Sequence, residues 1–246
     1  MFKFWQVVRF LSLALFFLVV TPASLLAKPP LDFVPSVQRY VYDIAYKNIA
    51  VGKVIRELHY QKADRITVNT RADLAFLFYH FGGNQLTDIY WDETSQSFLS
   101  KKFVRKSIGF SGGSLQAEFF DGGHQTRIRG DGEDQEFVNK EQPIIDFNVL
   151  GLQMSEGLKS GRTDFEFYMQ TEDSVAHYFF KVMGKDVIQT KFGQLHTYRI
   201  EQTGKDDRQL IVWFAPEINF QIVKFQYKRK LLDLSGVISA RSMINL

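Results

Sequence analysis

The chain has 246 residues, of which 45% are hydrophobic and 23% charged, and this is ample for one globular domain with a substantial core. The absence of cysteine excludes a disulfide scaffold, a zinc–thiolate site, an iron–sulfur cluster, a cysteine nucleophile and a cysteine-linked lipid anchor. The formal net charge of +3 is too small to indicate a nucleic-acid partner. Aromatic residues make up 15% of the chain, which favours β structure.

Residues 1–27 have the pattern of a secretory signal peptide. Lys3 and Arg9 provide a positive start, residues 10–20 are almost unbroken apolar sequence, and Ala27 offers a small residue for cleavage. The apolar stretch is shorter than the roughly 18 residues that a membrane-spanning helix needs. We therefore predict export to the periplasm through a cleavable signal peptide, without a lipid anchor. Cleavage would remove two positive charges and lower the net charge from +3 to +1.

The next residues divide into a linker and a β domain. Three of the six prolines lie in residues 28–36, which predicts an extended linker. From residue 37 the sequence alternates with period two, as in strands, and we assign residues 37–246 to a single β domain. The predicted strands cover residues 37–46, 51–61, 65–75, 86–92, 98–107, 114–120, 125–129, 163–169, 175–183, 185–191, 194–203, 208–214, 220–228 and 231–241. Residues 76–81 continue or bend the third strand, which ends at Gly82-Gly83.

Two segments interrupt this rhythm. Residues 130–142 are polar and acidic, which predicts an exposed loop. In residues 143–158 the apolar positions do not alternate, and Asp146 is a suitable cap for a short helix that runs to Leu158. Gly161 would follow its end. This is the one helix expected after the signal-peptide helix.

About a dozen short strands at this spacing, with no βαβ rhythm, are typical of an all-β sandwich or barrel. The predicted fold is all-β: an antiparallel, curved sheet or half-barrel of about a dozen strands with one short helix.

Residues 182–225 carry the most distinctive pattern in the chain. Gly193 precedes Thr197–Glu201 (TYRIE), and a charged hairpin then leads to Trp213–Glu217 (WFAPE), Phe220 and Val223–Phe225 (VKF). Tyr42–Lys53 (YDIAYKNIAVGK) adds an opening hairpin. Together these segments resemble the exported bacterial family known as domain of unknown function 3108. The resemblance extends from Tyr40 to about Arg241 and implies an exported, mostly antiparallel, barrel-like protein, with no catalytic residues to carry over.

Residues that could carry catalysis or bind a metal form no known local motif. No histidine has the spacing of a zinc hydrolase, and residues 109–114 lack the order of a serine nucleophile turn. No glycine pair has the context of a nucleotide loop, and the acidic cluster in residues 131–136 lacks the order of a calcium loop. We predict no catalytic residue, metal or cofactor. The histidines are His59, His80, His124, His177 and His196, and the clustered acids are Asp131, Glu133, Asp134 and Glu136.

The candidate ligand-binding residues are Tyr198, Trp213 and Phe214, because aromatic side chains line pockets for apolar or sugar ligands. The alternative is that the aromatic residues of this region seal the core. Residues 209–214 and 220–227 carry apolar side chains on both faces, whereas a strand wet on one side would alternate. These strands are therefore either covered on both faces, with the helix near residue 150 as one cover, or they border an apolar cavity.

The leading hypothesis is a non-enzymatic periplasmic protein that binds an apolar or amphipathic envelope component. The partner would be that ligand or an envelope protein, not nucleic acid, and the membrane would be met only through the signal peptide. A second hypothesis is a structural or interaction module of the cell envelope that uses sheet edges or exposed phenylalanine. A third is an envelope hydrolase whose site is assembled from distant strands.

Overall fold

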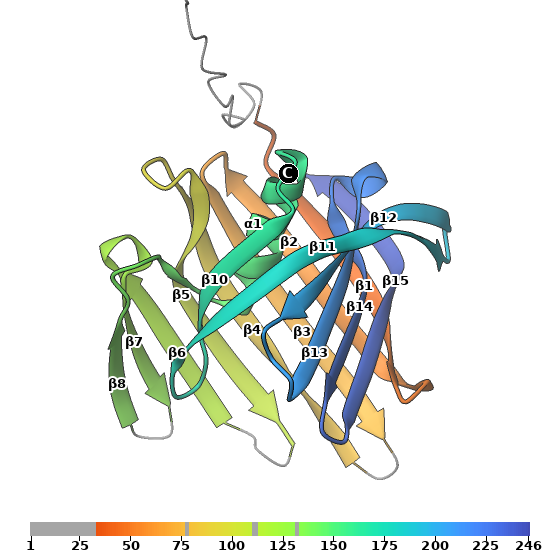
Figure 1. The fold of residues 1–246 in the computed structure, drawn as a ribbon, viewed down its shortest axis with the longest axis horizontal. Coiled ribbons are helices and arrows are strands. Elements are labelled where there is room, and N and C mark those ends of the chain that lie inside the picture. Colours follow the sequence, from red (N-terminus) through yellow and green to blue (C-terminus); the bar gives the residue numbers. More distant parts are fainter. Residues whose placement is uncertain (1–32, 77–78, 110–112, 131–132) are drawn as a thin grey trace, which may run out of the picture.

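The computed structural model describes residues 33–76, 79–109, 113–130 and 133–246, so the predicted signal peptide lies outside the described residues. Fifteen strands, one α-helix and two short 3₁₀-helices follow each other along the chain (Figure 1). They are β1 (Ser36–Tyr46), β2 (Ile49–Lys62), β3 (Arg65–Phe76), β4 (Tyr79–Asp92), β5 (Ser97–Ile108), β6 (Gly113–Phe120), η1 (Asp121–Gly123), β7 (Gln125–Gly130), β8 (Glu133–Val138), β9 (Ile144–Ile145), α1 (Phe147–Lys159), β10 (Asp164–Gln170), β11 (Val175–Thr190), β12 (Gly193–Thr203), β13 (Arg208–Ala215), η2 (Pro216–Ile218), β14 (Gln221–Arg229) and β15 (Leu232–Asn245).

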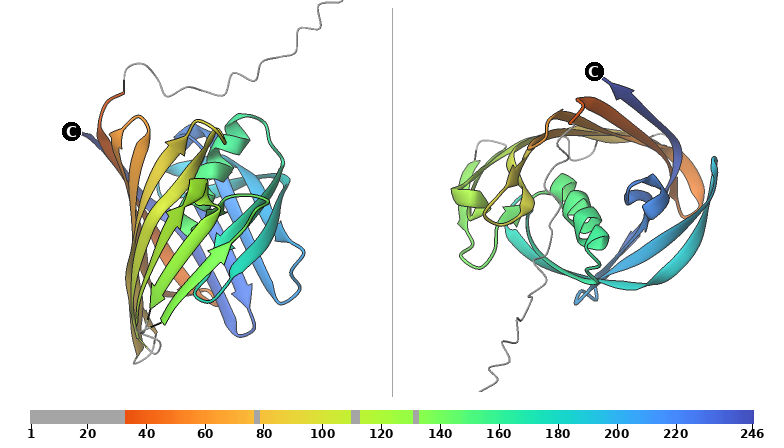
Figure 2. Two further views of the ribbon diagram at one scale, coloured as in Figure 1. Left: turned by 90° about the vertical axis from the view of Figure 1, so that its left-hand side faces the viewer. Right: turned by 90° about the horizontal axis from the view of Figure 1, so that it is seen from above.

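All fifteen strands belong to one sheet, in the order β8-β7-β6-β5-β4-β3-β2-β1-β15-β14-β13-β12-β11-β10-β9. Neighbouring strands are antiparallel except β9 and β10, which pair in parallel. The pairing of β1 with β15 joins the two halves of the chain. Figure 2 shows that this sheet curves around α1 as an open barrel. The predicted fold class is confirmed, with more strands than the dozen expected.

The curvature of the sheet has a local cause in its irregular registers. The ladder shifts at Ile44/Ala45, Asp88/Ile89, Val182/Gly184 and Trp213/Phe214, among other places. Each such bulge adds a residue to one strand, bends it and increases its twist. Bulges spread over both halves of the chain therefore roll the sheet up around the helix.

The prediction of an exposed loop over residues 130–142 is wrong, because β8 lies inside it. Its acidic residues face basic residues of β7 across the ladder. Arg127 Nη2 lies 2.6 Å from Glu136 Oε1, and Arg129 Nε lies 3.1 Å from Asp134 Oδ2. Opposite charges on directly opposed residues stabilise a strand pair, so this acidic run is a charged edge strand.

Two strand boundaries also differ from the prediction. Gly82 and Gly83 lie inside β4 and do not end a strand. A Cβ atom at Gly82 would lie 2.3 Å from the carbonyl oxygen of Ala72 on β3, so the absent side chain permits a close backbone approach. The two strands predicted at residues 175–183 and 185–191 form one continuous strand, β11, which ends at Thr190, because the bulge near Met183 changes the alternation without breaking the ladder.

Helix α1 lies inside the barrel, as the view from above shows (Figure 2). Asp146 is its N-cap, with its carboxylate accepting from the amide of Asn148, and Gly161 follows the helix end with a positive φ of 81°. The helix and its cap were therefore predicted correctly. Its buried apolar side chains, which join the main core, are Val149, Leu150, Leu152, Met154 and Leu158. Within the described part of the chain, no helix is long and apolar enough to cross a membrane.

Strand β13 is covered on both of its faces. Val212 and Phe214 are buried in the barrel core, and Trp213, which points to the opposite face, is also only 5% exposed. The β11–β12 hairpin pairs with β13 only from Tyr198 to Glu201, and its distal end packs against the outside of the sheet. There Asp186 Oδ2 accepts a hydrogen bond of 2.7 Å from Trp213 Nε1.

Further contacts hold this distal end in place. Lys191 Nζ lies 2.6 Å from Asp43 Oδ2 on β1, and the guanidinium of Arg241 on β15 lies 5.2 Å from the ring centre of Phe192. Two-sided apolar character in this part of the chain therefore reflects double coverage, by the barrel core inside and by a hairpin outside.

This double coverage predicts a strong dependence on Trp213. Trp213→Ala should lower the free energy of unfolding by about 3–5 kcal/mol because it leaves a cavity under the hairpin. Trp213→Phe keeps most of the packing and loses one hydrogen bond, and should cost about 1 kcal/mol. Urea denaturation followed by circular dichroism measures both. Phe192→Ala, at a side chain that is 37% exposed, is the control. If both Trp213 variants lowered the free energy of unfolding by the same small amount, this would contradict the coverage of the outer face of β13.

Candidate functional site

The N-terminus of α1 is held inside the barrel by a buried polar cluster, here called the polar seat (Arg56, Thr70, Gln85, Thr87, Ser100, Asp146 and Asn148). Asp146 is 1% exposed. Its carboxylate accepts hydrogen bonds from Ser100 Oγ at 2.7 Å, Gln85 Nε2 at 3.1 Å and Thr87 Oγ1 at 3.2 Å. It also accepts from the main-chain amide of Asn148 at 2.7 Å. One carboxylate thus joins two strands of the wall, β4 and β5, to the first turn of the helix.

Burial controls the titration of this carboxylate. Loss of hydration raises the pKa of Asp146 above the ordinary aspartate value. The hydrogen bonds from Ser100, Asn148 and Thr87 act against this rise, as does the positive charge of Arg56. Since desolvation is the largest effect, the folded protein favours the protonated acid more than the unfolded chain does.

Asn148 extends the polar seat to two more strands. Its Nδ2 donates to Thr87 Oγ1 at 2.9 Å, and its Oδ1 accepts from Thr70 Oγ1 on β3 at 2.9 Å. Its main-chain oxygen accepts from Arg56 Nη2 on β2 at 2.9 Å. The first turn of α1 is therefore bound to four consecutive strands, β2 to β5.

Arg56 is the least satisfied member of the polar seat. It is 8% exposed, its Nε has no hydrogen-bond partner, and it makes no ion pair among the residues described. Tyr40, Tyr42 and Tyr60 surround it closely enough to interact electrostatically. Burial raises the pKa of all three phenols, that of Tyr40 to about 12, so they remain neutral at physiological pH. Burial lowers the pKa of Arg56, but a guanidinium starts so high that it keeps its charge.

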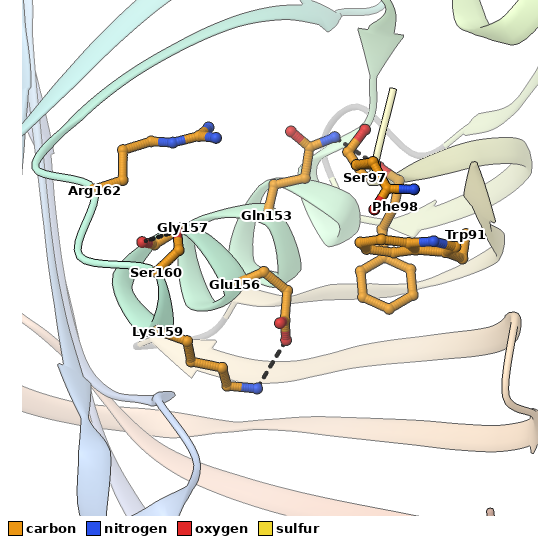
Figure 3. Close-up of a pocket in the computed structure, with 10 residues that line it drawn as sticks. Trp91, Ser97, Phe98, Gln153, Glu156, Gly157, Lys159, Ser160 and Arg162 are labelled. Carbon is orange, nitrogen blue, oxygen red and sulfur yellow. Dashed lines mark hydrogen bonds and ion pairs between the residues drawn. The ribbon is translucent and has the colours of Figure 1, made fainter. Parts of the chain in front are cut away.

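A pocket of about 150 Å³ lies at the end of the barrel where α1 ends, here called the mouth (Figure 3). Trp91 and Phe98 form one wall, with ring centres 5.1 Å apart and an edge-to-face angle of 76°. The C-terminal half of α1 forms the other wall, and Gln153 Nε2 donates to the carbonyl oxygen of Phe98 at 2.6 Å across it. The complete lining is Trp91, Gln96, Ser97, Phe98, Gln153, Glu156, Gly157, Lys159, Ser160 and Arg162.

The rim of the mouth pocket is polar and carries cationic groups. Lys159 Nζ lies 2.8 Å from Glu156 Oε1, which balances that charge. Arg162 is exposed, and its main-chain amide donates to the carbonyl oxygen of Gly157 at 2.8 Å. An aromatic wall below a polar, basic rim is a suitable surface for an amphipathic ligand.

A second pocket, of about 280 Å³, lies along the edge of the sheet at β7 and β8. Phe120 and Val138, which are 44% and 63% exposed, contribute apolar surface to it. Strand β8 pairs with β7 on one side and is the last strand of the sheet on the other. This region is thus an exposed sheet edge next to apolar side chains.

The three residues predicted from the sequence lie together around β12 and β13 but line neither pocket. Tyr198 opposes Phe214 in the ladder and stacks on Phe220 with ring centres 6.0 Å apart. Lys185 Nζ lies 4.9 Å from the ring centre of Tyr198. Trp213 points to the outer face, where Lys224 Nζ lies 4.6 Å from its ring centre. A ligand role for Tyr198, Trp213 and Phe214 stays a prediction.

Sequence reasoning missed Arg56, Trp91 and Phe98. Arg56 had a readable signal, since it shares the inward face of β2 with Leu58, where an apolar residue is expected. Trp91 and Phe98 are ordinary hairpin residues in sequence, and only the packing of α1 beside them creates a pocket.

The five histidines lie apart, each with its own neighbours. The pairs are His80 with Asp73 at 2.6 Å, His177 with Glu166 at 2.7 Å, His196 with Glu217 at 3.1 Å, His59 with Glu57 at 4.0 Å, and His124 with the carbonyl oxygen of Asn139 at 2.7 Å. Among the described residues, no group of three or more His, Asp or Glu side chains could hold a metal ion. These pairs lie mostly on the surface and give no sign of a shared site.

Comparison with known proteins places the chain in a family. The family model described as "Protein of unknown function (DUF3108)" matches residues 41–231, so the chain belongs to that family, as its motifs predicted. No curated protein matches the sequence. The chain is similar in fold to the crystal structure of a beta-barrel-like protein of the domain of unknown function DUF1849 from Brucella abortus, with a TM-score of 0.57 and 11% identity. That match covers 87% of this chain and 99% of the other.

The raised pKa of Asp146 predicts a specific pH dependence of stability. The native state holds a proton on Asp146 at pH values where the unfolded chain has lost it. The contribution of this residue to the free energy of unfolding therefore falls as the pH rises from the ordinary aspartate pKa of about 3.9 through the raised folded value. Asp146→Asn keeps a capping side chain and does not titrate. Wild type should lose stability relative to this variant as the pH rises, by about 1.4 kcal/mol for each unit of pKa shift.

Urea denaturation of both proteins across the acid and neutral range measures this difference. Asp206→Asn, at an exposed position, controls for the loss of one negative charge. A difference that grows in favour of wild type as the pH rises would mean that the hydrogen bonds outweigh burial and hold the pKa low.

Proposed function

We propose that this DUF3108 protein is a non-catalytic binding protein of the cell envelope that holds an apolar or amphipathic envelope component beside α1 at the mouth of the barrel. The observation that carries the proposal is the mouth pocket. It combines the Trp91–Phe98 pair with a rim that includes Lys159 and Arg162.

The size of the mouth pocket indicates how such a ligand would bind. Pockets that enclose a complete small molecule have volumes of about 300–1,000 Å³. The mouth pocket, at about 150 Å³, has room for only part of an amphiphile. An apolar portion would lie on the aromatic wall, while a polar portion meets the rim or solvent.

Periplasmic location is part of the same proposal. It is supported by the signal-peptide pattern of residues 1–27. A small exported protein that carries an amphiphile needs an apolar contact surface that is shielded from water. An aromatic wall beneath a helix provides such a surface.

A second candidate function is an interaction module of the envelope, and a different observation favours it. In the part of the chain that the structure describes, β8 is the last strand of the sheet on one side, and exposed Phe120 and Val138 lie beside it. The last strand of a sheet, next to apolar side chains, is a site at which an extended segment of another protein adds a strand.

Tryptophan fluorescence gives a direct test of the mouth pocket. After signal-peptide cleavage the chain retains Trp91 and Trp213, so Trp213→Phe leaves Trp91 as the single reporter. Titration of this variant with 11-bromoundecanoate should quench its fluorescence saturably, because bromine quenches an indole ring that it contacts. Phe98→Ala should weaken binding about tenfold, as expected for a loss of roughly 1.4 kcal/mol of aromatic contact.

Phe120→Ala is the matched control, because it removes an aromatic ring from the second pocket. It should leave the affinity unchanged. Absence of saturable quenching in the Trp213→Phe protein would contradict a ligand site at the mouth.

The interaction module predicts contact at β8 in cells. A photo-cross-linking amino acid at position 138 should yield a discrete adduct with an envelope protein, whereas the same group at position 231 should not. Leu231 is a suitable control because it is 80% exposed and lies in the turn between β14 and β15, away from the β8 edge. Identical patterns from the two positions would contradict a docking role for this edge.

A further inference from the structure

The guanidinium of Arg56 is buried without the partners that a buried charge normally has. It offers five N–H donors. Nη2 donates to the main-chain oxygen of Asn148, Nε has no partner, and no carboxylate among the described residues forms an ion pair with it. Buried charges are normally paired, since an unpaired one loses its hydration without compensation. The inner wall at β2 therefore carries a buried guanidinium that no carboxylate of the described residues contacts.

The neighbours of Arg56 do not supply a paired negative charge. Tyr40, Tyr42 and Tyr60 are neutral phenols, because burial raises the pKa of each. The hydroxyl groups of Tyr40 and Tyr42 already donate to Gln38 and to the carbonyl oxygen of Ile222. Asp146 interacts with Arg56 electrostatically, but no hydrogen bond or ion pair joins the two among the described residues, and the hydrogen bonds of Asp146 go to other groups.

Helix α1 occupies the space in which an anion would sit. Nε of Arg56 is inaccessible even to water, and a Cβ atom at Gly151 would lie only 3.2 Å from Nη1. The carbonyl oxygen of Asn148 stands where an anionic oxygen would accept from the guanidinium. An anion can thus reach Arg56 only when the first turns of α1 move away.

The composition and attachment of α1 make such a movement feasible. Two of its thirteen residues, Gly151 and Gly157, are glycines, which lower the intrinsic stability of a helix. Its N-terminus is held by hydrogen bonds, one of them from the Arg56 guanidinium itself, and by the Asp146 carboxylate, and water or a ligand can replace each of these. At its other end, Gly161 has a positive φ of 81° and open space around it.

We infer that α1 is a displaceable plug and that Arg56 is the anion-binding residue of the interior site that α1 covers, for a single-chain amphiphile with a carboxylate head. A carboxylate has the two coplanar oxygens that a guanidinium binds bidentately, and its single negative charge balances the charge of the guanidinium. The acyl chain would replace the apolar side chains of α1 against the barrel wall. This assignment rests on the proposed binding function but goes beyond it, because it places the carboxylate head at the N-terminus of α1, apart from the mouth pocket, and adds the opening step.

The alternative role for Arg56 is a tether that holds α1 through Asn148. The two roles predict opposite effects of Arg56→Met on the empty protein. Removal of a tether lowers the urea midpoint. Removal of an uncompensated buried charge in favour of an apolar side chain of similar length leaves the midpoint equal or raises it. We expect the second result.

The binding experiment compares dodecanoate with dodecanol, each below its solubility or micelle limit, by isothermal titration calorimetry on wild type, Arg56→Met and Arg56→Lys. Wild type should bind dodecanoate at least tenfold more tightly than dodecanol. Arg56→Met should bind both with similar affinity, and Arg56→Lys should keep part of the preference. Amide hydrogen exchange of residues 147–159 should become faster when wild type binds dodecanoate, because the plug leaves its seat.

Each outcome decides between the proposals. Binding of both probes with the same preference in wild type and Arg56→Met overturns the role of Arg56 while the binding function stands. Slower exchange in residues 147–159 on binding overturns the plug, because the ligand would then rest against a fixed helix. Failure of wild type to bind either probe overturns the binding function and this inference with it. If Arg56→Met does not fold, the same comparison is made with Arg56→Lys, whose unchanged preference and affinity would overturn the bidentate contact.

Discussion

The N-terminus of α1 lies inside the barrel, and the structure depends on satisfying the polar groups there. The first amides of any helix have no partner within the helix, and in this protein Asp146, Asn148 and Val149 are buried there, although Phe147 is exposed. The carboxylate of Asp146 caps one of these amides and at the same time binds Ser100 and Thr87 on the wall. The capping interaction thus becomes a tertiary interaction, which fixes both the depth and the direction of the helix.

A barrel built in this way has a packed interior on one side and a wall that is covered twice on another. Helix α1 fills one end of the barrel, the upper end in the left view of Figure 2. The distal end of the β11–β12 hairpin covers the outside of β13. The outer cover binds through Trp213 and Asp186, at the edge of the family motif. The aromatic pattern WFAPE therefore has a role in folding, whereas the two pockets lie elsewhere, beside α1 and at the β7–β8 edge.

The sequence predicted the strands, the helix and its cap because each depends on local pattern. Period-two alternation marks β1 to β3, and Asp146 before an apolar, non-alternating run marks α1. It failed at β8, where charge was read as exposure although the charges are paired across a ladder with Arg127 and Arg129. The mouth pocket could not be predicted from the sequence, because Trp91 and Phe98 line a pocket only when a helix from another part of the chain packs against their hairpin.

Arg56 connects the stability of this fold to its proposed function. A barrel packed around a helix would be more stable with an apolar residue at this position, since a buried guanidinium bonded to one carbonyl oxygen is poorly compensated. The same group, once α1 has moved, offers a bidentate, charge-assisted bond that no apolar residue provides. The empty protein is therefore less stable with Arg56 than it would be with an apolar residue at this position. A bound carboxylate offsets this loss of stability by pairing with the guanidinium. Binding and opening are then coupled through one side chain, without any need for a preformed cavity in the resting protein.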